Sequence, residues 1–194
     1  MAALHISLLG GFEARLASGE ALPLKGRKTQ ALLAYLAVGP GEPRSREELV
    51  ALFWGDRGEE QARSSLRQSL SELRKALGEA DHSPLIAGRD AVSLDTEAVD
   101  VDVTEFERLI DDGTPTALER AAELYRGDLL DGIGVHDPAF EDWLRDECQR
   151  LTERASGGRP RKPRRTSSAG CRRPRSPKGH APRGSRPRSC PAGR

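Results

Sequence analysis

The spacing of hydrophobic residues changes near residue 27, and this change separates predicted strands from predicted helices. Before it, short apolar runs at residues 5–9 and 12–16 lie on either side of a Gly-Gly pair, which allows a bend or bulge. A third run covers residues 22–24 and follows a turn-like Ser-Gly-Glu segment. The N-terminal part therefore predicts two or three short antiparallel strands.

Two helices are predicted next, from apolar residues that recur at intervals of three and four. The first begins at Arg27 and ends before a Gly-Pro-Gly breaker. The second follows a predicted capping box, in which Ser45 accepts from the amide of Glu48 and the Glu48 side chain reaches back. Gly55 ends this second helix.

A third helix, over residues 59–77, has the clearest amphipathic pattern, and Gly78 is placed to cap its end. After it, residues 85–94 predict a strand, a glycine-containing turn and a second strand. This hairpin carries Arg89 at its tip. The order of elements over residues 4–95 predicts a self-contained α+β unit.

Residues 99–155 predict an all-α region of short helices. Apolar positions indicate one helix around Val103, a second around Ala117 and a third that starts at Pro138. Helices paired in this way need stacked neighbours to bury their apolar faces. With 6 basic and 16 acidic residues, the region is a poor surface for nucleic acid.

Charge divides the chain a second time. Residues 1–155 hold 18 basic and 30 acidic residues, whereas residues 156–194 hold 13 basic and no acidic ones. The second segment also lacks Leu, Ile, Val, Phe, Trp and Tyr, so it has nothing to build a core from, and we predict that it is disordered. We therefore divide the chain into residues 1–98, residues 99–155 and a basic Arg/Pro/Gly-rich tail.

Other signals exclude several classes of protein. The N-terminus does not resemble a signal peptide, and no apolar run approaches the roughly 18–20 residues needed to cross a bilayer, so we expect a cytoplasmic protein without a membrane partner. Cys148, Cys171 and Cys190 are too few and too far apart for a disulfide framework or a metal site. No nucleophile has a base at a catalytic spacing, so we expect no enzyme, no metal and no cofactor.

The polar face of the third helix carries the candidate chemistry. Arg and Lys pair with guanine acceptors, Gln with adenine, and Ser with bases or phosphates, so a helix face made of these residues suits the DNA major groove. The face lies opposite the apolar stripe. Its members are Ser64, Gln68, Ser71 and Lys75, and Arg63, Arg67 and Arg74 line one flank of it, with Glu72 on the other flank.

Four more basic residues lie outside this helix. Lys25, Arg27 and Lys28 are at the start of the first helix, where cations and free amides together favour phosphate. Arg89 is placed to reach the minor groove. A basic-edged amphipathic helix is often only a solvated face, and residues 1–98 hold 12 basic against 14 acidic residues, so non-specific binding should be weak. The order of the elements, and not the charge, favours DNA binding.

Five segments together resemble a known family. In chain order they are "KGRKTQALLAYLA", "REELVALFWGD", "LRQSLSELRKALG", "YRGDLLDG" and "FEDWLRDECQRLTERA". The first three resemble the OmpR-type winged helix-turn-helix, and the last two resemble the early part of the bacterial transcriptional activator domain. This pairing is typical of SARP-type regulators, and the resemblance covers roughly residues 4–155.

The resemblance implies a fold, a site and partners. It implies a winged helix-turn-helix followed by an all-α, tetratricopeptide-like helical-repeat domain. The third helix then enters the major groove, and the wing with Arg89 contacts the backbone or minor groove. The implied partners are double-stranded DNA, RNA polymerase and a second copy of the chain on repeated sites. A link to a phosphorelay comes by family descent only, because no receiver domain precedes the winged helix.

Two expectations concern the end of the chain. The activator domain stops near Ala155, where further helices would follow, so we expect it to be incomplete. The tail has the composition of a GC-rich gene read out of frame, and we favour that origin over a genuine basic arm that binds nucleic acid or anionic partners.

The sequence thus predicts a sequence-specific, DNA-binding transcriptional regulator of the SARP type. The alternative is a helical-repeat adaptor for protein interaction whose winged helix serves dimerisation. Salt dependence separates the two, because binding to DNA weakens steeply as salt rises.

Overall fold

The structure, a computed structural model, describes residues 3–78 and 83–157. The predicted basic tail lies outside the described residues from position 158 onward, and so do Cys171 and Cys190. The predicted disorder of the tail therefore stays a prediction.

Strands β1 (Leu4–Ser7) and β2 (Glu13–Leu16) pair antiparallel, as predicted. The bend between them requires glycine at position 10, where φ is +94° and a Cβ would come within 3.0 Å of the Arg126 Cβ. The optional third strand at residues 22–24 is wrong. A single antiparallel bridge joins Ala21 to Arg15, and the amide of Leu22 donates to the carbonyl of Ala14 on β2 at 2.8 Å. The amide of Leu24 then donates to the carbonyl of Leu22 at 2.8 Å, so the backbone turns on itself and the pairing with β2 ends.

The third strand of this sheet is β6 (Val99–Val101), which the sequence analysis did not predict. It pairs parallel with β1, giving the strand order β2-β1-β6. Asp102 follows it directly and accepts hydrogen bonds from the amides of Leu8 and Leu9 at 2.9 and 3.0 Å. Residues from both sides of the predicted boundary at 98/99 therefore share one sheet.

The three predicted helices form with the predicted limits. They are α1 (Arg27–Val38), α2 (Arg46–Trp54) and α3 (Glu59–Leu77). Half of the predicted capping box is present, because the Ser45 hydroxyl accepts from the amide of Glu48 at 3.0 Å. The other half is wrong: the Glu48 carboxylate accepts from the Tyr35 hydroxyl on α1 at 2.6 Å. Burial and this hydrogen bond raise the pKa of Tyr35 to about 12.

The predicted hairpin forms the wing. Strands β4 (Leu85–Ala87) and β5 (Ala91–Leu94) pair antiparallel, with Arg89 in the turn between them. The short strand β3 (Arg44–Ser45), just before α2, pairs with β5 and gives the order β3-β5-β4. The wing is thereby attached to the N-terminus of α2.

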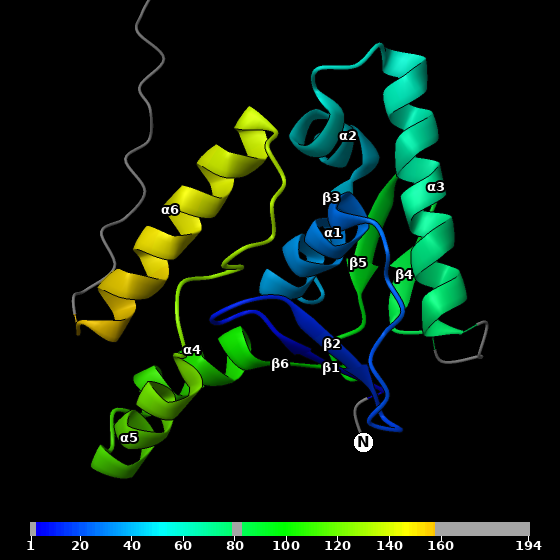
Figure 1. The fold of residues 1–194 in the computed structure, drawn as a ribbon. Coiled ribbons are helices and arrows are strands. Elements are labelled where there is room, and N and C mark those ends of the chain that lie inside the picture. The colour runs from blue at the N-terminus through cyan, green and yellow to red at the C-terminus, as the bar shows by residue number, and fades with distance from the viewer. Residues whose placement is uncertain (1–2, 79–82, 158–194) are drawn as a thin grey trace, which may run out of the picture. The chain divides into compact units, whose positions relative to one another are not determined.

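Three helices follow the wing and β6, as predicted. They are α4 (Asp102–Asp112), α5 (Pro115–Leu124) and α6 (Pro138–Ala155). Helices α4 and α5 lie side by side, while α6 packs against α2 and α4 (Figure 1). The structure shows a winged helix followed by a few helices, and the repeat character of this region stays a prediction.

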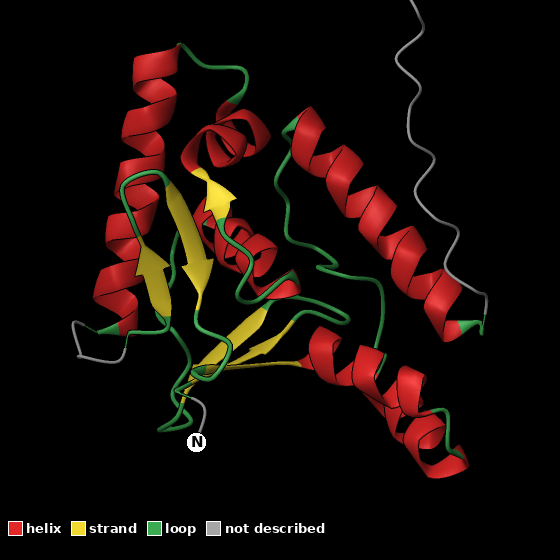
Figure 2. Ribbon diagram, turned by 180° about the vertical axis from the view of Figure 1, so that it is seen from behind, coloured by secondary structure: helices red, strands yellow, loops and turns green. Residues whose placement is uncertain are grey.

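Aromatic side chains join α6 to the winged helix. The Phe140 ring is fully buried and lies 5.1 Å from the Phe53 ring, and the Trp143 ring lies 4.8 Å from that of Tyr35. Figures 1 and 2 show α2 between α6 and α3. The outer side of α3 therefore faces away from the helices that follow the wing.

None of the helices in the described parts of the chain has the length and apolar character that a membrane span requires.

Candidate nucleic-acid interface

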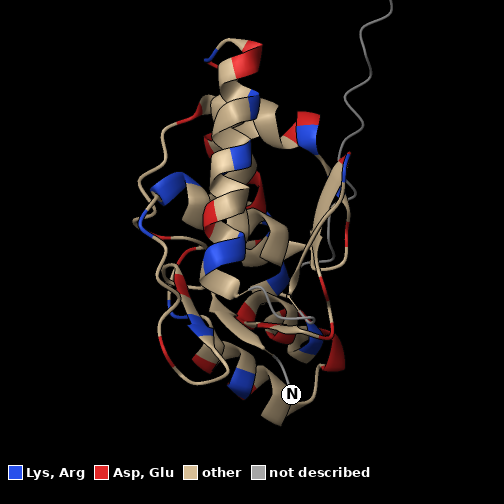
Figure 3. Ribbon diagram, turned by 90° about the vertical axis from the view of Figure 1, so that its right-hand side faces the viewer, with Lys and Arg blue, Asp and Glu red and all other residues tan. Residues whose placement is uncertain are grey.

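Helix α3 presents a polar face to solvent along its length (Figure 3). On its apolar side, Leu66, Leu70 and Leu73 are each at most 2% exposed, and the helix packs against α1 and α2. At 100° per residue, the seven predicted polar residues cover an arc of about 140°. All of them are exposed: Arg63, Ser64, Arg67, Gln68, Ser71, Arg74 and Lys75. The structure therefore brings the whole predicted face together, in a form that a major groove can admit.

Glu72, at the flank of this face, attaches α3 to the start of α1. Its carboxylate accepts from the Thr29 hydroxyl at 2.9 Å and from the amides of Lys25 and Gly26 at 3.1 and 3.4 Å. Burial alone would raise the pKa of Glu72, but these hydrogen bonds outweigh it, and the pKa lies below its ordinary value. Two amides just before the start of α1 therefore already bind a carboxylate.

Of the three basic residues predicted at the start of α1, Lys28 contacts neighbouring groups of the protein, and the phosphate role of all three stays a prediction. The Lys28 ammonium lies 2.6 Å from the Asp137 carboxylate, donates to the carbonyl of Phe53 at 2.6 Å and stands over the Trp54 ring. It therefore ties α1 and α2 to the start of α6.

The other two basic residues at this end are exposed. Arg27 packs against Gly134, where an added Cβ would overlap its guanidinium. Lys25 lies beside Glu72, to which its amide donates. Neither side chain belongs to the polar face of α3.

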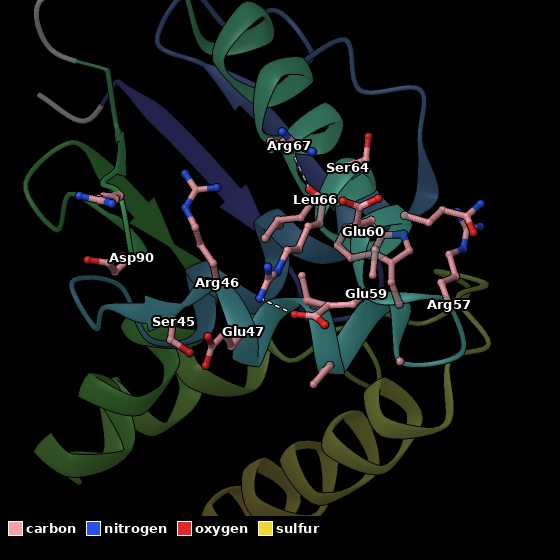
Figure 4. Close-up of a pocket in the computed structure, with 18 residues that line it drawn as sticks. Ser45, Arg46, Glu47, Arg57, Glu59, Glu60, Ser64, Leu66, Arg67 and Asp90 are labelled. Carbon is pink, nitrogen blue, oxygen red and sulfur yellow. Dashed lines mark hydrogen bonds and ion pairs between the residues drawn. The ribbon is translucent and has the colours of Figure 1, made fainter.

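A groove of about 1450 Å³ lies between α2, the first half of α3 and the wing (Figure 4). Four of the predicted residues line it: Arg63, Ser64, Arg67 and Arg89. The remaining predicted residues of α3 continue the polar face beyond the groove: Gln68, Ser71, Arg74 and Lys75. The groove and the outer side of α3 thus form one continuous polar surface that contains all eight of these predicted residues.

The sequence analysis did not single out two of the arginines that line the groove. Arg46 is the first residue of α2, and Arg57 lies in the turn between α2 and α3, where its guanidinium donates to the Ser65 hydroxyl at 3.3 Å. The predicted helix limits were a sufficient signal for both residues, because they place Arg46 at the start of α2 and Arg57 between α2 and α3.

The groove is nearly balanced in charge. Its five arginines face four acidic residues, namely Glu47, Glu59, Glu60 and Asp90. Glu59 and Arg63 pair at 2.6 Å along α3. Because few charges are left unbalanced, attraction to phosphate alone should be modest, and affinity has to come from hydrogen-bond complementarity.

Two arginines connect the helices to the wing. Arg46 donates from Nε and Nη2 to the carbonyl of Gly88 at 3.2 and 3.0 Å, and Arg74 donates from Nη2 to the carbonyl of Ala87 at 3.2 Å. Arg89, between these anchored positions and β5, is exposed. The tip of the wing is therefore held by side chains of both α2 and α3.

The described residues show no metal chemistry. Within residues 3–78 and 83–157, no group of three or more His, Cys, Asp or Glu side chains is arranged to hold a metal ion. Burial raises the pKa of the Cys148 thiol, which disfavours the reactive thiolate.

The helix pair α2–α3 with a β-hairpin wing beside it defines a winged helix-turn-helix domain. Comparison with protein families agrees with this class: residues 19–93 match the family described as "Transcriptional regulatory protein, C terminal". The match covers less than half of the chain, and over these residues the chain is similar to the OmpR-type winged-helix domain, which is a DNA-binding domain of transcription regulators.

A solved structure is similar over a longer stretch. It is that of Mycobacterium tuberculosis EmbR in complex with a low affinity phosphopeptide, with a TM-score of 0.65 and 22% sequence identity. The similarity covers 80% of this chain and 43% of that chain, so the present chain spans less than half of EmbR. At this identity the likeness shows the fold alone. No curated protein matches the sequence.

Proposed function

We propose that the chain is a sequence-specific transcriptional regulator of the SARP type that reads promoter DNA with α3 in the major groove. The observation that carries this proposal is the exposed polar face of α3, bounded by the groove on one side and fixed by Glu72 on the other. A helix held in this way presents base-reading side chains at a defined rotation.

Base contacts are assigned to the middle of the face. Among the described residues Arg67 has one hydrogen bond, from Nε to its own helix at 3.4 Å, which leaves its terminal nitrogens for the O6 and N7 acceptors of guanine. Gln68 is exposed beside it and can pair with adenine in the same way. Ser64, Ser71 and Lys75 complete the reading face.

Backbone contacts are assigned to the edges. Arg57 and Arg63 lie near the start of α3, where they can meet the phosphates of the strand that borders the groove. Arg89 at the wing tip is assigned to the neighbouring minor groove. We do not extend this role to Arg27 or Lys28, whose side chains lie against the segment that leads into α6.

The helices after the wing are proposed to form the first part of a bacterial transcriptional activator domain that contacts RNA polymerase. Support comes from their position: α6 packs on α2, so the helices lie away from the outer side of α3 (Figure 1). A partner can therefore contact them while α3 occupies DNA. We further propose that two copies bind repeated sites and that the protein acts in the bacterial cytoplasm.

Selection of bound duplexes from a random-sequence library, with the full chain as bait, tests the proposal. We expect a consensus sequence, followed by a footprint on a natural promoter that contains it. If the chain binds no duplex at low salt but forms dimers, the adaptor function is correct instead.

Two variants test the assignment of the reading face. Arg67→Ala and Gln68→Ala should each weaken binding to the selected duplex by about 1–3 kcal/mol and relax the preference at one base pair. Arg145→Ala and Gln149→Ala on α6 are matched controls, because both side chains are exposed and lie outside the interface. Equal affinities for all four variants would show that another surface reads the DNA.

A further inference from the structure

We propose that Arg46 is a positioning residue for the wing: it holds the hairpin turn against the start of α2 and thereby sets where Arg89 stands relative to α3. This inference rests on the proposed DNA binding. It adds the separate claim that Arg46 acts through the wing and does not itself contact DNA.

Arg46 binds the turn on both sides of Arg89. Its Nε and Nη2 donate to the carbonyl of Gly88 at 3.2 and 3.0 Å, and its backbone amide donates to the carbonyl of Asp90 at 2.9 Å. The residues before and after Arg89 are thus both bonded to one residue of the helix-turn-helix.

Neighbouring contacts complete the attachment. Arg74 on α3 donates to the carbonyl of Ala87 at 3.2 Å, and Ser45 pairs with Ala91 in the β3–β5 ladder. The turn is consequently held from α2, from α3 and from β3, so its place relative to the reading face is determined.

The hairpin needs this support. Its strands are only 3 and 4 residues long, and short two-stranded hairpins are marginally stable on their own. Within the turn the amide of Gly88 donates to the carbonyl of Ala91 at 2.9 Å, but among described residues the carbonyl of Gly88 receives its hydrogen bonds from Arg46. Arg89 has no hydrogen bond or ion pair with any described residue, so its position follows that of the turn.

The surroundings of Arg46 also favour a structural role. Two of its three side-chain nitrogens are directed to one carbonyl oxygen, and Glu47 and Asp90 line the same part of the groove. An arginine frequently binds phosphate through two parallel hydrogen bonds from paired nitrogens. In Arg46, the paired nitrogens Nε and Nη2 already donate to the wing.

The test is a double-mutant cycle in the full chain, with a labelled mixed-sequence DNA duplex and a titration of salt. Each charge contact with DNA contributes about 0.9 to the slope of log K against log salt. We expect Arg46→Ala and Arg89→Ala each to lower the slope by about 0.9, and the double variant to lower it no further. A double variant that loses about 1.8 would mean two independent contacts and would overturn the proposal.

Arg46→Gln separates the hydrogen bond from the charge. The amide nitrogen of Gln stands at the same number of bonds from the backbone as Nε of Arg, so it can donate to the carbonyl of Gly88 without carrying charge. We expect this variant to keep the wild-type slope and its full sensitivity to Arg89→Ala. If it loses the same slope as Arg46→Ala, the charge of Arg46 meets phosphate and the proposal is wrong.

Arg57→Ala is the matched control, because Arg57 lines the same groove without bonding to the wing. Its effect should add to that of Arg89→Ala. An effect of Arg57→Ala that vanished in the Arg89→Ala background would show that the cycle reports general damage to the groove.

A measurement without DNA keeps the two claims apart. Backbone ¹⁵N relaxation should show faster, larger motion of residues 88–91 in Arg46→Ala than in the wild type, with the wild-type values restored in Arg46→Gln and unchanged in Arg89→Ala. Failure of the wild type to bind any duplex would refute the proposed function alone. Unchanged motion in Arg46→Ala would refute the positioning role, whatever the duplex experiment shows.

Discussion

Glu72 on α3 accepts a hydrogen bond from the Thr29 hydroxyl on α1 at 2.9 Å. The same carboxylate binds the amides of Lys25 and Gly26, so a side chain of the proposed reading helix is hydrogen-bonded to the segment that leads into α1. Rotation of α3 about its axis would break all three bonds. These three bonds therefore act together with the buried leucines of α3 to fix the orientation of the polar face.

We expect Glu72→Gln to lower the free energy of unfolding by about 1 kcal/mol at neutral pH, the net contribution typical of a hydrogen bond. The hydrogen bonds, opposed by burial, lower the pKa of Glu72 below its ordinary value of 4.5 in the folded protein. Its stabilisation is therefore complete above pH 4.5 and is lost as the pH falls through the lower folded-state pKa.

Urea denaturation of wild type and Glu72→Gln at several pH values measures this effect. The difference between the two proteins should shrink as the solution becomes acidic. Glu119→Gln, an exposed residue of α5, serves as the control and should show a small difference. A loss for Glu72→Gln that stays constant down to acidic pH would contradict the assigned role of the carboxylate.

Lys28→Met should destabilise the fold without changing DNA affinity. It leaves the Asp137 side chain, which is 8% exposed, without its cation, and we expect a loss of about 2 kcal/mol because Lys28 itself is partly solvated. Lys28→Met combined with Asp137→Asn should recover part of this loss, since no buried charge remains. Denaturation and a duplex titration are measured on the same samples. An unchanged stability together with a smaller salt slope would assign Lys28 to a phosphate.

Phe140→Ala should cost about 3–5 kcal/mol, as expected for a fully buried aromatic ring. Because this ring packs on Phe53 of α2, we expect residues 3–157 to unfold in one transition, followed by circular dichroism and by tryptophan fluorescence. Leu118→Ala is the control, since Leu118 is 44% exposed. Two separated transitions in the wild type would show that α6 folds independently of the winged helix.

Asp102→Ala should cost about 1–3 kcal/mol, because it leaves the amides of Leu8 and Leu9 without their acceptor. Asp102→Asn keeps one acceptor oxygen and should cost less. Amide hydrogen exchange gives the local readout: exchange at Leu8 and Leu9 should accelerate more in the alanine variant than in the asparagine variant. Equal exchange in both would mean that the carboxylate does not hold the sheet to α4.

Local signals in the sequence were sufficient for the helices and the wing. Ser45 marks the start of α2, Gly55 ends it, and Gly78 follows the end of α3 with φ of +82°, a conformation that glycine adopts without strain. Helical periodicity alone also determines which residues share a face. Arg67 and Gln68 were therefore placed correctly on the exposed side of α3 before any tertiary contact was known.

Contacts between distant segments were beyond this reasoning. Strand β6 consists of three residues whose partner, β1, lies far away in the chain, and no local pattern announces such a parallel pairing. The same holds for Lys28, which the sequence placed on a phosphate and the structure places against Asp137. Ionic and hydrogen-bonding groups choose their partners by distance in space, and that distance is known only when the chain has folded.

The sequence by itself determined the order of elements and the polar face of α3, because backbone periodicity and end signals act over a few residues. Only the tertiary structure decided which groups the basic residues contact. Lys28 pairs with Asp137 at the start of α6, and Arg46 and Arg74 donate to carbonyls of the wing. Glu72 accepts a hydrogen bond from the first turn of α1. Each of these depends on packing that brings a donor to an acceptor from another element.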